Sequence, residues 1–242
     1  MKEWKCGLRD GVPIAIGYFA VSFGFGVVTF QNGMPPWLAV LMSVTNLTSA
    51  GQFAGLEVIA SATGLAVATI CEILLTQLII NLRYALMSLS LTQKLSPDIK
   101  GWQRLVVAFG NTDEIFAVAM ARTKDLTFPY MVGLQILPIV GWTGGTAVGA
   151  LACELLPASL QVALGVALYG MFIAVVVPVA RRYRPVLTVV LVALLCSCLI
   201  KYVPAALGWP PLSGGFSVII STVVASAIGA VLFPVQEEGD GV

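Results

Sequence analysis

Long apolar segments fill almost all of this chain, and they constrain its fold more than any other feature of the sequence. Eight of them lie between Gly, Pro and polar residues: 12–31, 36–62, 65–91, 105–121, 128–152, 158–180, 185–203 and 214–235. A helix needs about 20 apolar residues to cross the hydrocarbon core of a bilayer. The sequence therefore predicts an all-α, polytopic membrane helix bundle of about six to eight membrane segments.

Charge is too scarce in this chain for a soluble protein. Charged residues make up 10% of the 242 residues, whereas soluble domains usually contain about 25%. Such a chain cannot cover a globular surface with polar groups, which excludes soluble enzymes and nucleic-acid-binding proteins. The apolar runs also lack the alternation of membrane β-strands, so we expect helices. We expect the lipid bilayer as a partner, and no nucleic acid.

His and Cys give no sign of a metal or redox centre. His is absent, which removes imidazole proton relays and His-ligated metal sites. The five cysteines include no CxxC pair, and four of them fall in apolar runs, where a free Cys behaves as a small hydrophobic residue. We therefore expect no metal, no cofactor and no enzyme activity.

Basic residues predict the orientation of the chain. Eleven of the thirteen Lys and Arg residues fall in four clusters: Lys2/Lys5/Arg9, Lys94/Lys100/Arg104, Arg122/Lys124 and Arg181/Arg182/Arg184. The positive-inside rule places all four clusters, and the N-terminus, in the cytoplasm. Three apolar segments separate the first two clusters, although the number of crossings there must be even. Either eight spans leave one basic loop outside, or six full spans are accompanied by two segments that enter the membrane and turn back.

We expect one transmembrane transporter domain over residues 1–242. It begins with the basic segment 1–11 and ends with the short acidic tail 236–242. No small-residue cleavage pattern follows the first apolar segment, so we interpret this segment as a first span and not as a removed signal peptide.

Two apolar segments have polar interruptions at their centres. Residues 43–52 read Ser-Val-Thr-Asn-Leu-Thr-Ser-Ala-Gly-Gln, and residues 110–114 read Gly-Asn-Thr-Asp-Glu. Non-helical backbone at membrane depth is tolerated only against protein or a water-filled cavity, and transporters use such breaks to present helix ends to a substrate. We predict broken or re-entrant elements at both places. In the second, we expect Asn111 to be the N-cap of a new helix, with Glu114 at position N3 of a capping box.

Segment 65–91 carries two polar stripes if it is helical. The stripes are Gln77/Asn81/Tyr84/Ser88 and, on the opposite side, Glu72/Thr76/Arg83. One stripe is expected to line a pathway and the other to face a charged neighbour or a partner chain. Arg83 needs either a carboxylate of the chain, such as Asp113 or Glu114, or the carboxylate of a substrate.

Small residues recur in segment 128–152. Gly141, Gly145 and Gly149 follow Pro138 in a small-xxx-small register, which allows another helix to approach closely. That helix belongs either to this chain or to a second subunit.

Several short motifs occur in a characteristic order along the chain. They are Leu8-Arg9-Asp10-Gly11-Val12-Pro13, Phe23-Gly24-Phe25-Gly26, Met42-Ser43, Ser49-Ala50-Gly51-Gln52-Phe53, Asn81-Leu82-Arg83 and Thr112-Asp113-Glu114-Ile115-Phe116. Over about residues 8–180, the set resembles the AzlC family of bacterial branched-chain amino-acid exporters. The sequence departs from the family at Tyr84, where the family often has His, and at residues 47–50, which read Leu-Thr-Ser-Ala instead of Phe-Ala-Gly-Ala.

The resemblance implies an inner-membrane large subunit that works with a small AzlD-type membrane partner and exports valine, leucine, isoleucine or similar amino acids. Such a zwitterion needs donors for its carboxylate, acceptors for its ammonium group and an apolar pocket. The candidate substrate-binding residues are Asn46, Ser49, Gly51, Gln52, Asn81, Arg83, Asp113 and Glu114. Two alternatives stay open: a non-transporting assembly or receptor subunit, and a transporter for another small zwitterionic or organic solute.

Overall fold

The computed structural model describes residues 2–62, 64, 66–155, 157, 159–160, 170, 173, 176–210 and 212–234, and these are almost entirely helical. The helices are α1 (Lys2–Gln31), α2 (Pro36–Thr45), α3 (Ser49–Ser61), α4 (Val67–Thr92), α5 (Gly101–Phe109), α6 (Asp113–Ala121), α7 (Phe128–Ala152), the 3₁₀ turn η1 (Cys153–Leu155), α9 (Arg184–Leu207) and α10 (Gly214–Leu232). Within the described ranges α1, α4, α7, α9 and α10 are long and apolar enough to cross a membrane. The predicted all-α, polytopic membrane bundle is confirmed, while the predicted segment 158–180 lies mostly outside the described residues.

The chain forms two compact units. Unit 1 contains residues 1–53 and 80–170, and unit 2 contains residues 54–79 and 171–242. Helices α3 and α4 each contribute residues to both units. The single transporter domain over residues 1–242 stays a prediction.

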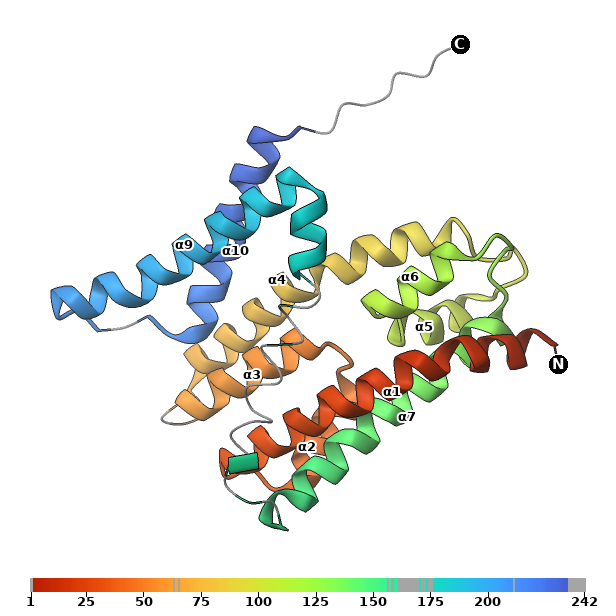
Figure 1. Cartoon of the computed structure of the whole chain (residues 1–242), viewed down its shortest axis with the longest axis horizontal. Coiled ribbons are helices and arrows are strands. Elements are labelled where there is room, and N and C mark those ends of the chain that lie inside the picture. Colours follow the sequence, from red (N-terminus) through yellow and green to blue (C-terminus); the bar gives the residue numbers. More distant parts are fainter. Residues whose placement is uncertain are drawn as a thin grey trace. The chain divides into compact units, whose positions relative to one another are not determined.

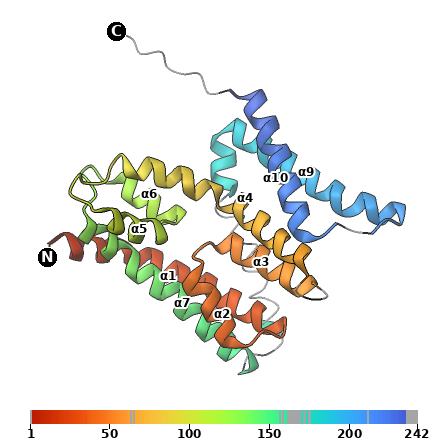
Figure 2. The same ribbon diagram turned by 180° about the vertical axis from the view of Figure 1, so that it is seen from behind.

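Helices α1 and α7 pack side by side along their length in unit 1 (Figures 1 and 2). Glycines on both helices face the backbone of the other helix, and we call this contact the glycine seam: Gly7, Gly11 and Gly26 of α1 with Gly133, Gly141, Gly145 and Gly149 of α7. A Cβ on Gly11 would lie 2.7 Å from the carbonyl oxygen of Leu134, a distance that real Cβ atoms essentially never show. The small-xxx-small register of α7 therefore serves packing within this chain, because all three of its glycines contact α1.

Both predicted breaks are confirmed. Helix α2 ends at Thr45 and α3 begins at Ser49, and α5 ends at Phe109 while α6 begins at Asp113. Next to the second break, a hydrophobic core contains side chains from the end of α4, α5, α6, α7 and the loops that follow α4 and α6. This core comprises Leu91, Leu95, Ile99, Val107, Ile115, Ala119, Leu126, Tyr130, Met131 and Leu134.

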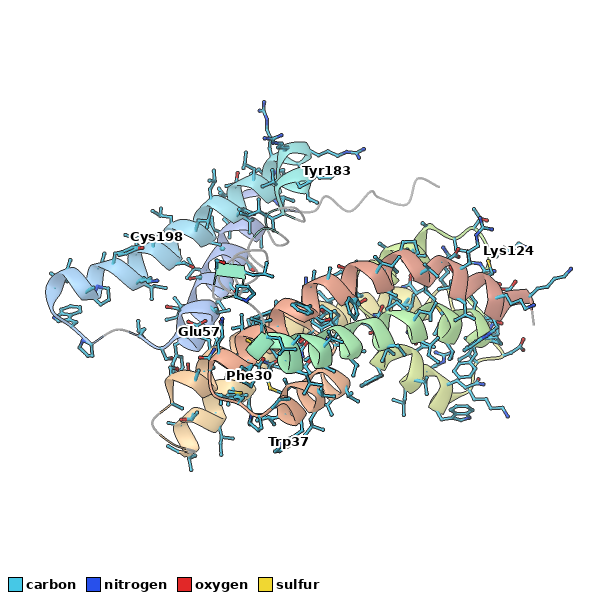
Figure 3. All side chains as sticks on the ribbon, turned by 60° about the horizontal axis from the view of Figure 1, so that its bottom comes forward. Phe30, Trp37, Glu57, Lys124, Tyr183 and Cys198 are labelled. Atoms are coloured by element: carbon cyan, nitrogen blue, oxygen red, sulfur yellow. The ribbon has the colours of Figure 1, made fainter. Side chains whose placement is uncertain are left out.

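Three of the basic clusters meet at one end of unit 1. Arg122 forms an ion pair with Glu3, at 2.5 Å, and the Lys94 ammonium donates to the carbonyl oxygens of Met120 and Arg122. Figure 3 shows Lys124 at this end, and Phe30 and Trp37 toward the other. The start of α1, the end of α4 and the end of α6 thus share one end. Helices α5 and α6 together therefore return to the end of unit 1 from which they start, as expected for a segment that enters the membrane and turns back.

Unit 2 contains the paired helices α9 and α10. Ser197 of α9 donates a hydrogen bond to Ser221 of α10 at 3.0 Å. The first turn of α10 lies against two acidic side chains: Ser213 donates to the carboxylate of Glu72, and a Cβ on Gly214 would lie 2.6 Å from Oε1 of Glu57. None of the residues of α9 is buried within the described part of the chain.

Candidate functional site

A cavity of about 180 Å³ lies where the two helix breaks meet the middle of α4, inside unit 1. Its lining combines hydroxyl, amide and phenol groups with apolar side chains. The lining residues are Thr45, Asn46, Leu47, Thr48, Asn81, Tyr84, Ala108, Phe109, Asn111 and Thr112. Pockets for drug-sized ligands measure about 300–1,000 Å³, so this cavity fits a smaller solute.

Four helix ends border this cavity. The C-terminal ends of α2 and α5 contribute Thr45 and Phe109, and the residues that immediately precede α3 and α6 contribute Thr48 and Thr112. A helix carries about half a negative charge at its C-terminus and about half a positive charge at its N-terminus. The cavity therefore offers attraction to both charges of a zwitterion.

The first turn of α6 is occupied by charged and polar groups of the chain itself. Asp113 forms an ion pair with Arg83, with 2.8 Å between Oδ2 and Nη1, and both side chains are about half exposed. The guanidinium also donates to the Tyr84 hydroxyl at 3.1 Å and lies 4.8 Å from the centroid of the Tyr84 ring. From α1, the Tyr18 hydroxyl hydrogen-bonds to Thr112 Oγ1 at 2.6 Å and donates to the carboxylate of Glu114. Of the two alternatives for Arg83, a carboxylate of the chain or that of a substrate, the structure shows the first.

The first turn of α3 is held by a closed ring of neutral hydrogen bonds. The Trp142 indole N–H donates to Gln52 Oε1 at 2.8 Å, and Gln52 Nε2 donates to Ser43 Oγ at 3.0 Å. Thr146 donates to the carbonyl oxygen of Trp142, so its hydroxyl accepts the proton of Ser43 at 2.7 Å. All four side chains are buried. The ring begins at the indole of Trp142 and ends at the carbonyl oxygen of the same residue. It connects α2, through Ser43, and α3, through Gln52, to α7.

Asn111 does not act as the predicted N-cap, and this prediction is wrong. Helix α6 begins at Asp113, its N-cap is Thr112, and the amide of Phe116 donates to the carbonyl oxygen of Thr112 at 2.8 Å. Glu114 is therefore at position N2 and not at N3. The side chain of Asn111 is held by a different contact, in which its Nδ2 donates to Ser88 Oγ at 3.2 Å, and its Oδ1 accepts no hydrogen bond from a backbone amide of α6.

The two polar stripes of α4 separate as predicted, except that Arg83 also bonds to a residue of the other stripe. Asn81 and Tyr84 line the cavity, and Ser88 accepts from Asn111. Glu72 accepts from Ser213 in unit 2. Arg83, grouped with Glu72 and Thr76 by its angle on the helix, meets the charged neighbour expected for that stripe in Asp113, and it also donates to Tyr84 of the other stripe.

The eight predicted site residues fall into three sets. Asn46 and Asn81 line the cavity, whereas Arg83, Asp113 and Glu114 belong to the charged groups around the start of α6. Ser49 and Gly51 are in the first turn of α3, and Gln52, which is 1% exposed, belongs to the hydrogen-bonded ring. In the described ranges, no group of three or more Cys, Asp or Glu residues could hold a metal ion.

Other residues at this site were not among the predicted ones. The lining residues that were not named as candidates are Thr45, Leu47, Thr48, Ala108, Phe109, Asn111 and Thr112, whereas Tyr84 was placed on the stripe that could line a pathway. Tyr18 and Trp142 were missed as well, although they support the site from α1 and α7 with ring centroids 5.3 Å apart. The polar runs around both breaks signal most of the lining. Tyr18 and Trp142 carry no local signal, because a single aromatic residue in an apolar helix is ordinary.

Comparisons with known proteins agree with this architecture. The chain is 28% identical over 210 residues to the inner membrane protein YgaZ of Escherichia coli (strain K12), covering 83% of each chain. It is 30% identical over 222 residues to an uncharacterized membrane protein of Archaeoglobus fulgidus, covering 87% of this chain and 94% of the relative. A Helicobacter pylori (strain J99) membrane protein is 25% identical over 154 residues, or 62% of this chain and 64% of that relative. No solved structure gives a significant match.

A family model assigns the chain more directly. The model described as AzlC protein matches residues 13–156, which include both helix breaks and every residue that lines the cavity. The relationship to YgaZ confirms the predicted location in the inner membrane, and the five candidate spans agree with it. The chain is therefore a multi-pass membrane protein that belongs to the AzlC family.

Proposed function

We propose that this protein exports branched-chain or similar apolar amino acids, such as valine, leucine and isoleucine, across the bacterial inner membrane by alternating access. One observation carries the proposal: the cavity lies at the ends of two broken helices, so that two positive and two negative helix ends border the same small space. Secondary transporters bind small charged solutes at such places near the bilayer midplane.

The lining of the cavity suits an amino acid with an apolar side chain. The substrate carboxylate would bind at the N-terminal end of α3, where the amide of Ser49 lies in the first helical turn. The ammonium group would lie toward the C-terminal ends of α2 and α5. Leu47, Ala108 and Phe109 supply an apolar wall for the side chain.

The charged groups at α6 would then position the site. Arg83 is engaged by Asp113 and Tyr84 in this conformation, so it holds the start of α6 against α4. Tyr18 holds the same helix start from α1 through Thr112 and Glu114. Asn46 and Asn81 would contact the substrate directly, since both line the cavity.

We further propose that a small AzlD-type membrane subunit assembles with this chain. Membership of the AzlC family supports this, and α9 offers a long apolar surface that the described part of the chain leaves uncovered. The bilayer alone also covers such a surface, so the partner requires its own test.

Efflux of labelled valine from preloaded proteoliposomes tests both proposals. We expect valine-specific efflux from vesicles that contain this chain together with the small partner, and less or none from empty vesicles. Equal efflux with and without the partner would contradict the partner proposal. Absence of specific flux both with and without the partner would contradict a transport function and favour a non-transporting assembly or receptor subunit.

A further inference from the structure

Asn111 lines the cavity and is a buried amide whose oxygen lacks a hydrogen-bond donor among the described residues. The residue is 4% exposed and lines the cavity, and its Nδ2 donates to Ser88 Oγ at 3.2 Å. Its carbonyl oxygen Oδ1 is buried and accepts no hydrogen bond from the described part of the chain. A buried acceptor without a donor costs free energy, so this position favours a ligand that brings one.

The chemistry of the acceptor selects which group of a zwitterion it receives. An amide oxygen accepts hydrogen bonds through two lone pairs and donates none. An ammonium group carries three donors, whereas a carboxylate carries only acceptors. Of the two charged groups on an amino acid, only the ammonium group complements Oδ1 of Asn111.

The two helix starts beside the cavity support the same orientation. Asp113 and Glu114 occupy the first turn of α6, so the positive end of this helix is already compensated by carboxylates of the chain. The first turn of α3 contains no acidic residue. The substrate carboxylate is therefore attracted to α3, which leaves the ammonium group on the side of Asn111.

We infer that Asn111 is the acceptor for the α-ammonium group of the substrate, and that it restricts transport to α-amino acids. The inference rests on the proposed function and adds a selectivity to it: 2-oxo acids with the same carbon skeleton are rejected. A site that hydrogen-bonds a substrate group discriminates strongly against an analogue without it, because its own polar atom is then left unpaired.

Competition in proteoliposomes tests the inference. Efflux of labelled leucine is measured against unlabelled leucine, 4-methyl-2-oxopentanoate, which lacks the ammonium group, and 3-methylbutylamine, which lacks the carboxylate. In the wild type we expect leucine to compete and the oxo acid to compete at least about 100-fold more weakly.

Two variants and a matched control separate the possible outcomes. Asn111→Ala removes the acceptor, and we expect the apparent KM for leucine to rise about tenfold or more while the preference for leucine over the oxo acid falls toward one. Asn111→Asp keeps an acceptor and adds charge, so leucine should still compete and the amine should compete better than in the wild type. Asn32→Ala is the control, because Asn32 is exposed just after the end of α1. This variant should change neither the apparent KM for leucine nor the preference for leucine over the oxo acid.

Failure of the inference differs from failure of the proposed function. Absence of leucine flux in the wild type contradicts the proposed function. Leucine flux with an unchanged preference in Asn111→Ala overturns the inference. If Asn111→Ala does not reach the membrane, Asn111→Asp decides: loss of leucine flux in this variant, with the protein monodisperse in detergent, overturns the inference, and retained flux with stronger competition by the amine supports it.

Discussion

The two helix breaks of unit 1 have the same architecture and opposite chemistry. At the first, between α2 and α3, the chain is anchored by the neutral ring of Gln52, Ser43, Trp142 and Thr146. At the second, between α5 and α6, it is anchored by charged groups, through the Arg83–Asp113 ion pair and the bond from Tyr18 to Glu114. One helix start is therefore compensated by acids of the chain, whereas the first turn of the other contains no acidic residue.

This difference separates two roles that a broken helix can play. A buried neutral network fixes its members in one arrangement, because each side chain of the ring is hydrogen-bonded to the next. A half-exposed ion pair is weaker and can rearrange. We therefore expect the first break to define the shape of the site and the second to change as the transporter cycles.

The largest effect is expected from breaking the charged anchor. Arg83→Gln leaves Asp113 unpaired at membrane depth, and Asp113→Asn leaves Arg83 unpaired, so each should lower leucine flux by about 100-fold. Flux and the amount of protein in the membrane are measured together. Lys201→Gln is the matched control, because it removes an exposed basic residue of α9.

The double variant Arg83→Gln/Asp113→Asn sharpens this result. If the pair serves only to anchor α6, removing both charges should restore part of the flux that either single variant loses. Flux near the wild-type level in both single variants would show that the charged anchor is dispensable.

The next effect concerns the neutral ring. Gln52→Ala removes two hydrogen bonds and leaves the Trp142 indole N–H and the Ser43 hydroxyl oxygen without this partner. We expect the free energy of unfolding to fall by about 2 kcal/mol, measured by thermal unfolding in detergent. Gln93→Ala, at an exposed position, should leave the melting temperature unchanged. Equal melting temperatures of the two variants would contradict a structural role for the ring.

A third experiment makes the first break resemble the second. Ser49→Asp places an acid in the first turn of α3, where none is present. It should stabilise the protein by about 0.3–1 kcal/mol through the helix dipole. It should also raise the apparent KM for leucine by about tenfold, a change of about 1.4 kcal/mol, because the acid competes with the substrate carboxylate.

Ser49→Asn controls for size without adding charge. The prediction requires stability and affinity to move in opposite directions in Ser49→Asp only. An unchanged KM in Ser49→Asp would place the substrate carboxylate away from α3.

The smallest effect is expected at the link from α1 to α6. Tyr18→Phe removes the hydroxyl that bonds to Thr112 and Glu114 but keeps the ring against Trp142. Interhelical hydrogen bonds in membranes contribute about 0.6 kcal/mol on average, so we expect a loss of about this size in thermal stability. A loss as large as that of Gln52→Ala would mean that the two anchors are equally strong.

Local sequence was sufficient to predict the breaks but not their anchors. Polar residues at the centre of an apolar segment cannot face lipid, so residues 43–52 and 110–114 indicate breaks without any knowledge of tertiary structure. The pairing of Arg83 with an acid follows in the same way, because few carboxylates are available at membrane depth. These predictions depend on composition and order alone.

The remaining features depend on partners that are distant in the sequence. Trp142 is 90 residues from Gln52, and Tyr18 is 94 residues from Thr112. Nothing near Gln52 reveals that its amide is already satisfied, so the sequence presents it as a candidate for substrate binding. The error at Asn111 has the same origin, since local rules give no sign that its side chain donates to Ser88, which is 23 residues away.

The glycine seam between α1 and α7 has a consequence for surveys of mutational tolerance. At Gly26, Gly145 and Gly149 even an alanine methyl group would collide with the backbone of the opposite helix, and helix backbones yield far less than flexible side chains. Every substitution at these positions is therefore expected to abolish function, which is the profile that such surveys assign to residues that bind substrate. Only the amount of folded protein in the membrane distinguishes the seam glycines from residues proposed to bind substrate. This amount should fall sharply when a seam glycine is substituted and should stay near the wild-type level when Asn111 is substituted.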